Sequence, residues 1–169
     1  MELVSFEWWS MIVRWLHIFS GIMWIGHLYY FNFTQTPMMP KIPAEQRPAV
    51  TGFIAPTALF WFRWGAAATI VFGLILAWMG GFLGQAIALG IGTHDKRFVA
   101  IGFGMWLGTI MFLNVWVIIW PNQKKILGLV SATPEERTRS ARVAGLASRV
   151  NVMLSIPMLY GMVANHFYA

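Results

Sequence analysis

The sequence predicts an all-α fold: an integral membrane protein built as an antiparallel bundle of four transmembrane helices, with a short cytoplasmic surface helix. Hydrophobic residues make up 58% of the 169 residues and charged residues only 11%, and the mean hydropathy is +0.62. This composition is typical of chains that are embedded in lipid. Residues 1–169 are expected to form a single transmembrane domain whose main partner is the lipid bilayer.

Four apolar runs are long enough to cross a membrane. They cover about residues 10–31, 58–80, 98–120 and 150–168. Each run supplies the roughly 20 residues that a spanning helix needs. Trp and Tyr residues lie near the ends of the runs, where an aromatic belt contacts the membrane–water interface. Because the number of spans is even, both termini are expected on the same side of the membrane.

A basic helix is predicted between the third and fourth runs. Thr133, Pro134 and Glu136 form a capping box, in which a Thr caps the helix and a Glu three residues later caps it in return. The helix is expected over about 134–148, on the cytoplasmic surface, leading into the fourth span.

Glycine and proline punctuate the rest of the chain. The proline-rich segment 34–43 predicts an irregular or interfacial connector, and the glycine-rich segment 81–93 predicts an interfacial loop or a helix extension. Gly104 and Gly108 form a GxxxG pair in the third run, which favours the close approach of another helix without identifying it.

The basic residues predict the topology. Two loops, 32–57 and 121–149, hold most of the Lys and Arg, and cytoplasmic loops carry this excess. Both termini are therefore expected in the periplasm, if the chain lies in a bacterial inner membrane. The net charge of +6 then reflects topology and does not indicate nucleic-acid binding. The residues on the cytoplasmic side are Lys41, Arg47, Lys124, Lys125, Arg137, Arg139, Arg142 and Arg149, with Arg63 at its edge.

Several kinds of chemistry are excluded by composition. The chain has no cysteine, which rules out disulfides, thiolate metal sites, iron–sulfur clusters and covalently attached haem. The sequence contains no paired carboxylates, no nucleophile–base constellation and no phosphate-binding motif, so no catalytic residue is assigned. Any redox chemistry would have to come from a cofactor.

The polar residues within the spans gather at two ends. Ten residues separate His17 from His27, which is about 15 Å along a helix, so the two cannot ligate one metal ion. Ionisable residues inside a membrane are costly and usually functional. One group comprises Arg14, His17, His94, Lys96, Arg97, Asn165 and His166, and the other comprises His27, Arg63, Asn114, Asn122, Gln123, Arg149 and Asn151.

The first group predicts a haem b site. His17 and His166 lie near the same end of antiparallel spans and would ligate the iron, because neutral imidazole is a good iron ligand. Arg14, Lys96 or Arg97 would pair with the propionates, and Gly21 leaves room for a flat ring. The alternative is that these histidines are interfacial hydrogen-bonding residues.

The second polar cluster consists of His27, Arg63, Asn114 and Asn151. His27 is either a second haem ligand, with Arg63 and Arg149 near the propionates, or a residue that hydrogen-bonds a neighbouring helix. Asn114 and Asn151 are expected to bridge helices, as amides in spans usually do.

Three segments resemble one family of bacterial membrane proteins. They are RWLHIFSGIMWIGHLYYF, GTIMFLNVWVIIWPNQKKI and NVMLSIPMLYGMVANHF, in three of the four expected spans. They resemble the membrane domain of PuuD-type urate hydroxylases, the urate oxidase N-terminal family. The first segment is also similar to the first span of HemJ-type protoporphyrinogen oxidases and of copper-resistance D proteins.

The resemblance implies functional positions and a partner. His17 and His166 match the family pattern, whereas His27 stands where the family typically has a small residue. Full-length members carry a cytochrome c domain, and this sequence has no Cys-x-x-Cys-His motif, so a separate cytochrome c-type electron partner is implied. The matching positions are Arg14, His17, Trp24, Asn114, Pro121, Asn122, Gln123, Asn151, Pro157, Asn165 and His166.

Two function hypotheses follow. The first is a haem-b membrane redox protein that passes electrons or oxidises a small molecule with a separate partner. The second is a non-catalytic accessory subunit of a larger respiratory, photosynthetic or oxygenase complex, or a homo-oligomer, in which the histidines are structural. Copper handling is a weaker third reading, from Met38, Met39 and the 11 methionines, although Met is also an ordinary filler of membrane interiors.

Overall fold

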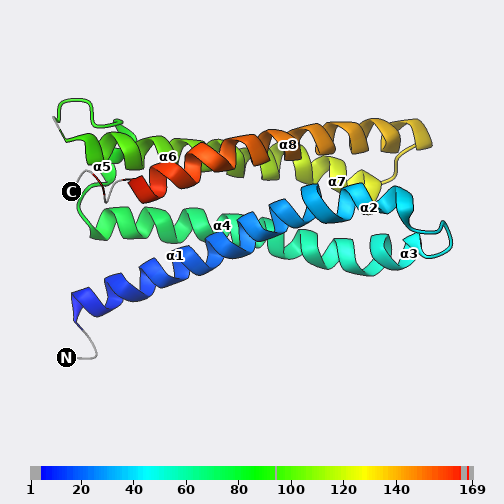
Figure 1. Cartoon of the computed structure of the whole chain (residues 1–169), viewed down its shortest axis with the longest axis horizontal. Coiled ribbons are helices and arrows are strands. Elements are labelled where there is room, and N and C mark those ends of the chain that lie inside the picture. Colours follow the sequence, from blue (N-terminus) through cyan, green and yellow to red (C-terminus); the bar gives the residue numbers. More distant parts are fainter. Residues whose placement is uncertain (1–4, 94, 165–166, 168–169) are drawn as a thin grey trace.

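The computed structural model of the chain describes residues 5–93, 95–164 and 167. Within these residues the fold is helical and contains no strand, which confirms the all-α prediction. Four antiparallel segments form the bundle, Phe6–Lys41, Arg47–Met79, Lys96–Ile126 and Pro134–Ala164 (Figure 1). Each is long and apolar enough to cross a membrane, so the chain is a multi-pass membrane protein.

Several of these segments combine different kinds of helix. The first consists of α1 (Phe6–Tyr29), a π-helical stretch (Tyr30–Gln35), α2 (Thr36–Met38) and a 3-10 stretch (Met39–Lys41). The second consists of α3 (Arg47–Ala49), a π-helical stretch (Val50–Ile54) and α4 (Ala55–Met79). After α5 (Leu83–Ile87), the third consists of α6 (Lys96–Leu113), a π-helical stretch (Asn114–Ile119) and α7 (Trp120–Ile126). The fourth is α8 (Pro134–Ala164).

Each π-helical stretch ends two residues before a proline, namely Pro37, Pro56 or Pro121. Proline lacks an N–H, and its ring clashes with the carbonyl four residues earlier, so a wider turn allows the helix to continue. The prediction of an irregular connector over 34–43 is therefore wrong as far as Lys41, because the helix passes through Pro37.

The basic segment 134–148 is helical, as predicted, but it runs directly into the fourth span. Its capping box is confirmed: the Thr133 N–H donates to Glu136 Oε2 at 2.9 Å, and the Glu136 N–H donates to Thr133 Oγ1 at 3.2 Å. Residues 135–156 contain no proline, so nothing in the sequence ends the helix at the membrane boundary. The basic part thus extends the bundle beyond its apolar part instead of forming a separate helix.

The glycine-rich segment between the second and third spans folds back on the bundle. It contains the short helix α5, which lies against α6. Trp106 of α6 donates its indole N–H to the carbonyl of Ile87 at 3.0 Å. This contact holds α5 beside the first turns of α6.

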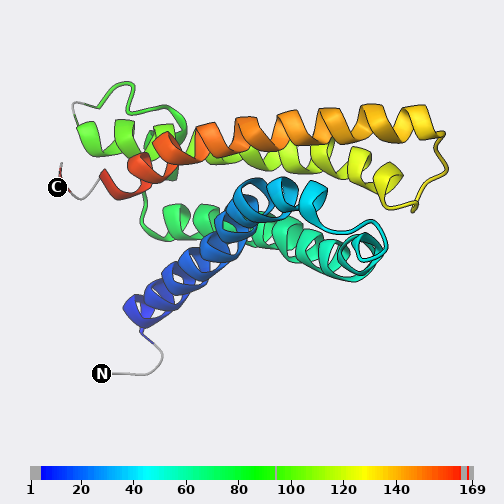
Figure 2. The same ribbon diagram turned by 45° about the vertical axis from the view of Figure 1, so that its right-hand side comes forward.

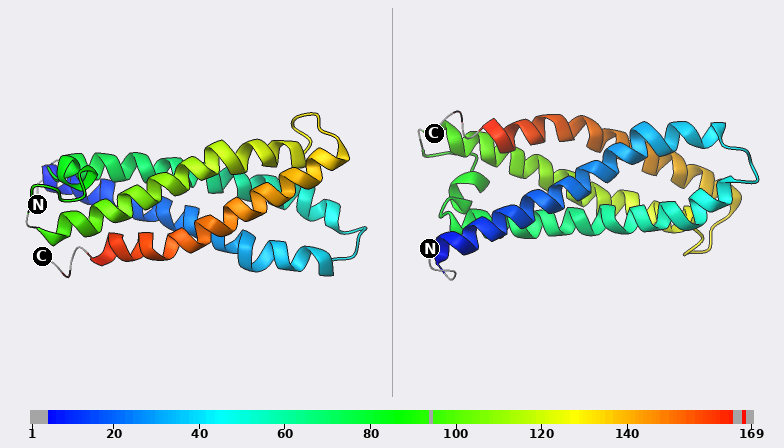
Figure 3. Two further views of the ribbon diagram at one scale, coloured as in Figure 1. Left: turned by 90° about the horizontal axis from the view of Figure 1, so that it is seen from above. Right: turned by 60° about the horizontal axis from the view of Figure 1, so that its bottom comes forward.

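The helices form two pairs, α1 with α4 and α6 with α8 (Figures 2 and 3). Glycine lets both pairs approach closely. A Cβ atom at Gly65 of α4 would lie 3.1 Å from a backbone nitrogen of α1, and one at Gly161 of α8 would lie 2.8 Å from Ala100 O of α6. A Cβ at Gly104 would lie 3.1 Å from Met158 O. The GxxxG face of α6 is therefore covered by α8 of the same chain.

The core lies where the two pairs meet. Trp24, Leu28, Phe62, Met111 and Val115 are all 0–1% exposed. Toward its N-terminal end, α1 diverges from α8 (Figures 1 and 2). The outside of the bundle also carries many large apolar side chains, which is expected of a surface that faces lipid.

Candidate functional site

His17 of α1 is half-buried against α4. Its Nδ1 lies 2.9 Å from the carbonyl oxygen of Thr69. The ring also lies directly over Gly73, where an added Cβ would be only 2.8 Å from His17 Cε1. Because a carbonyl can only accept a hydrogen bond, Nδ1 carries the proton, and Nε2 keeps a free lone pair. This is the arrangement in which a histidine is oriented to ligate a metal ion through Nε2.

The other members of the first polar group lie toward the same end of the bundle. Arg14 is exposed on α1, about one turn before His17. Lys96 and Arg97 begin α6, which starts at the end of the bundle where α1 begins and α8 finishes (Figure 1). His94, Asn165 and His166 lie outside the described residues, so the predicted pairing of His17 with His166 stays a prediction.

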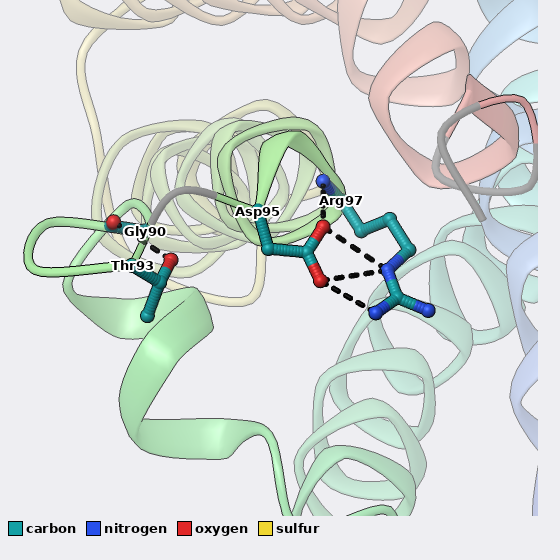
Figure 4. A network of polar contacts seen from close by, with 4 residues as sticks. All are labelled: Gly90, Thr93, Asp95 and Arg97. Atoms are coloured by element: carbon teal, nitrogen blue, oxygen red, sulfur yellow. Dashed lines mark hydrogen bonds and ion pairs between the residues drawn. The ribbon is translucent and has the colours of Figure 1, made fainter.

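Arg97 is held by an acidic partner at the start of α6 (Figure 4). Its Nε lies 2.8 Å from Asp95 Oδ2, and its backbone N–H donates to Asp95 Oδ1 at 2.9 Å, so Asp95 caps the helix. The side-chain hydrogen bonds from Arg97 hold the pKa of the Asp95 carboxyl below its usual value. A preceding turn is closed by Thr93, whose hydroxyl donates to Gly90 O at 2.9 Å. Arg97 thus already has a counter-ion in the structure.

The second polar cluster does not form a single site. Asn114 and Asn151 do meet: Asn114 Nδ2 donates to Asn151 Oδ1 at 2.7 Å and to Ala147 O at 2.8 Å, and Asn151 Nδ2 donates to Met111 O at 3.1 Å. Asn151 is fully buried. These bonds tie the third span to α8, which confirms the bridging role expected for the two amides.

Arg63 lies on a different face of the bundle. Its guanidinium carbon is 3.2 Å from the centre of the Trp120 ring and 6.0 Å from that of Trp116. Its Nε is buried and has no hydrogen-bond partner in the described part of the chain. The aromatic faces stabilise the charge by a cation–π interaction. No carboxylate of the described residues forms an ion pair with Arg63.

His27 hydrogen-bonds its own helix, through Nδ1 to Met23 O at 2.6 Å. Of the two alternatives for His27, the bond to a neighbouring helix is not seen among the described residues, because Nδ1 bonds the carbonyl one turn earlier in its own helix. His27 also lines a shallow groove of about 340 Å³ with Ile22, Met23, Gly26, Tyr30, Ile54 and Ala58. Ala58 and Arg63 are five residues apart on α4, about 140° around the helix, so Arg63 faces away from this groove.

Sequence reasoning missed two polar contacts between the first helical segment and α8. The Tyr29 hydroxyl donates to Ser155 Oγ at 2.9 Å, because the Ser155 hydroxyl donates to Val152 O. Asn32 donates to Ser148 Oγ at 2.7 Å. A signal was present, since Ser148, Asn151 and Ser155 recur at spacings of three and four residues, which places them on one face of α8.

The two methionines that suggested copper lie next to each other near the end of the first helical segment. Met38 is exposed and Met39 is half-buried at the end of the first segment. Among the described residues, no group of three or more His, Cys, Asp or Glu side chains is placed to hold a metal ion.

One comparison with known proteins gives a match. A family model described as Urate oxidase N-terminal matches residues 3–55 and 92–169, which together make up most of the chain. No curated protein and no solved structure matches the chain. The matched segments include His17, the Asn114–Asn151 bridge and the whole of α8.

Proposed function

The chain belongs to the urate oxidase N-terminal family, and we propose that it is a haem-b-binding membrane redox protein. In this proposal it passes electrons or oxidises a small molecule together with a separate partner. The observation that carries the proposal is the environment of His17, whose Nδ1 donates to Thr69 O while Nε2 has no hydrogen bond to any residue that the structure describes.

The surroundings of His17 fit a haem in three respects. The Thr69 carbonyl orients the imidazole and makes Nε2 more basic, as a partner of the non-ligating nitrogen does in metal sites. Gly73 leaves the ring the room to lie against α4. Gly21, one turn along α1, adds no side chain beside it. His17 would hold the iron through Nε2, and the haem would supply one-electron chemistry.

The second ligand in this proposal is His166. It follows the end of α8 in the sequence, and α1 starts farther out along the bundle than α8 ends (Figures 1 and 3). His17 lies about three turns after the start of α1. Its position along the bundle axis is therefore closer to the end of α8 than its distance from the start of α1 suggests. Arg14 and Lys96 are exposed toward the same end and would pair with the propionates, whereas Arg97 would first have to leave Asp95.

The distribution of the basic residues supports an outer position for this site in the membrane. The loops with the excess of Lys and Arg lie at the opposite end from the start of α1. By the positive-inside rule, the His17 end then faces the periplasm of a bacterial inner membrane. A soluble cytochrome c-type protein would be a suitable electron partner there.

The test is the haem content per chain of protein purified in mild detergent after expression with added haem. We expect the wild type to retain haem and His17→Ala and His166→Ala to lose most of it. His27→Ala is the matched control, since His27 has the same protonated Nδ1 but lies elsewhere, and it should keep its haem. Folded wild-type protein without haem would refute the proposal and leave the histidines as structural residues.

A further inference from the structure

The groove beside His27 has the features of a small ligand site. It is a shallow depression of about 340 Å³ between α1 and the second helical segment. Ile22 and Ile54, on its two sides, are 65% and 50% exposed, so the groove opens on the surface that faces lipid. A ligand would therefore enter from the membrane.

His27 determines which chemical group this groove accepts. Its Nδ1 donates to Met23 O at 2.6 Å, so the proton is on Nδ1. Nε2 is then an acceptor, and no hydrogen bond links it to any residue that the structure describes. A ligand that satisfies this nitrogen has to bring a donor, such as a hydroxyl group.

Tyr30 adds a second polar group on the same side of the groove. It follows His27 by three residues, so the two side chains lie on one face of the helix. Its hydroxyl can donate or accept. The remaining wall is formed by Ile22, Met23 and Ile54 and by the small residues Gly26 and Ala58, which suit a flat apolar ring.

We propose that this groove binds the reduced, hydroxylated ring of a membrane quinol. One quinol hydroxyl donates to His27 Nε2, the ring lies over Gly26 and Ala58, and the isoprenoid tail stays in the surrounding lipid. The oxidised quinone carries only acceptor oxygens and cannot bond to Nε2 of a neutral imidazole whose proton is on Nδ1. The groove should therefore prefer quinol to quinone by about tenfold, the value of one net hydrogen bond. This inference does not depend on the haem.

The experiment measures binding of decylubiquinol and decylubiquinone, under anaerobic conditions, to quinone-free protein in lipid nanodiscs. His27→Phe removes the acceptor and should abolish the preference for the reduced form. Ile54→Trp fills the groove from the second helical segment and keeps His27 in place as a residue. It should weaken binding of both the quinol and the quinone. Val117→Trp adds the same indole to another exposed position, remote from the groove, and should bind like the wild type.

Two results would overturn the proposal. One is equal binding of both redox forms to the wild type, which would show that His27 Nε2 does not select a donor. The other is binding of both forms that Ile54→Trp leaves unchanged, which would show that the ligand does not lie in this groove. If His27→Phe fails to fold, the proposal is still tested by Ile54→Trp and by the comparison of quinol with quinone binding to the wild type.

Discussion

The contact between His17 and Gly73 yields the sharpest prediction, through the substitution Gly73→Ala. The added Cβ would lie 2.8 Å from His17 Cε1 and 3.0 Å from Nδ1, so the imidazole has to move by about 1 Å to restore ordinary van der Waals contact. A shift of that size away from α4 breaks the 2.9 Å hydrogen bond to Thr69 O. The loss of this bond, with the donor left half-buried, is expected to cost about 1–3 kcal/mol.

Gly145→Ala in α8 is the matched control, because a Cβ there meets no other atom within 4 Å. Both substitutions gain about the same helix propensity, roughly 1 kcal/mol, so the difference between them isolates the effect on His17. The assay is thermal unfolding in one detergent, with haem content measured on the same samples. Gly73→Ala should be less stable than Gly145→Ala and should hold less haem. Equal stability and equal haem content in the two variants would refute the role given to the His17–Thr69 contact.

Three further predictions concern the packing of the bundle and the start of α6. Asn151→Leu removes two buried hydrogen bonds and keeps the number of side-chain heavy atoms, so it should lower the free energy of unfolding by about 1–3 kcal/mol in a denaturant titration. Adding Asn114→Leu to this variant should lower the free energy of unfolding only a little further. Gly161→Val places a side chain against the backbone of α6 and should cost at least about 3 kcal/mol, seen as loss of the cooperative thermal transition. The pKa of Asp95 is lowered in the folded state, so its pairing with Arg97 stabilises the fold at pH values above the unfolded-state pKa of about 3.9. This contribution disappears as the pH falls through the lower folded-state pKa. Asp95→Asn should therefore make the free energy of unfolding depend less on pH in the acid range.

The prolines explain where the predicted boundaries failed. Pro37 and Pro56 lie in a stretch that reads as a connector, because proline removes a helical hydrogen bond and clashes with the preceding turn. In the structure a π-helical stretch precedes each of them and absorbs the clash. Propensity alone does not reveal this, because it counts proline as a helix breaker and takes no account of a wider turn before it.

The amides and the histidines differ in how far the sequence predicts their contacts. Asn114 and Asn151 had to find partners inside the membrane, and packing of α6 on α8 leaves them facing each other. A histidine can hydrogen-bond either a carbonyl of its own helix, as His27 does, or a carbonyl of a neighbouring helix, as His17 does. The pattern of residues gives the depth of each ring but not which helix its Nδ1 will meet.

Electron paramagnetic resonance of the oxidised protein tests the proposed role of His17 most directly, with wild type and His17→Ala measured side by side. The ligation proposed for His17 predicts a low-spin ferric haem signal in the wild type, as two imidazole ligands produce, and its loss or conversion to a high-spin signal in His17→Ala. A wild-type spectrum without haem iron, or a low-spin signal that survives in His17→Ala, would contradict the assignment of His17 as the ligand.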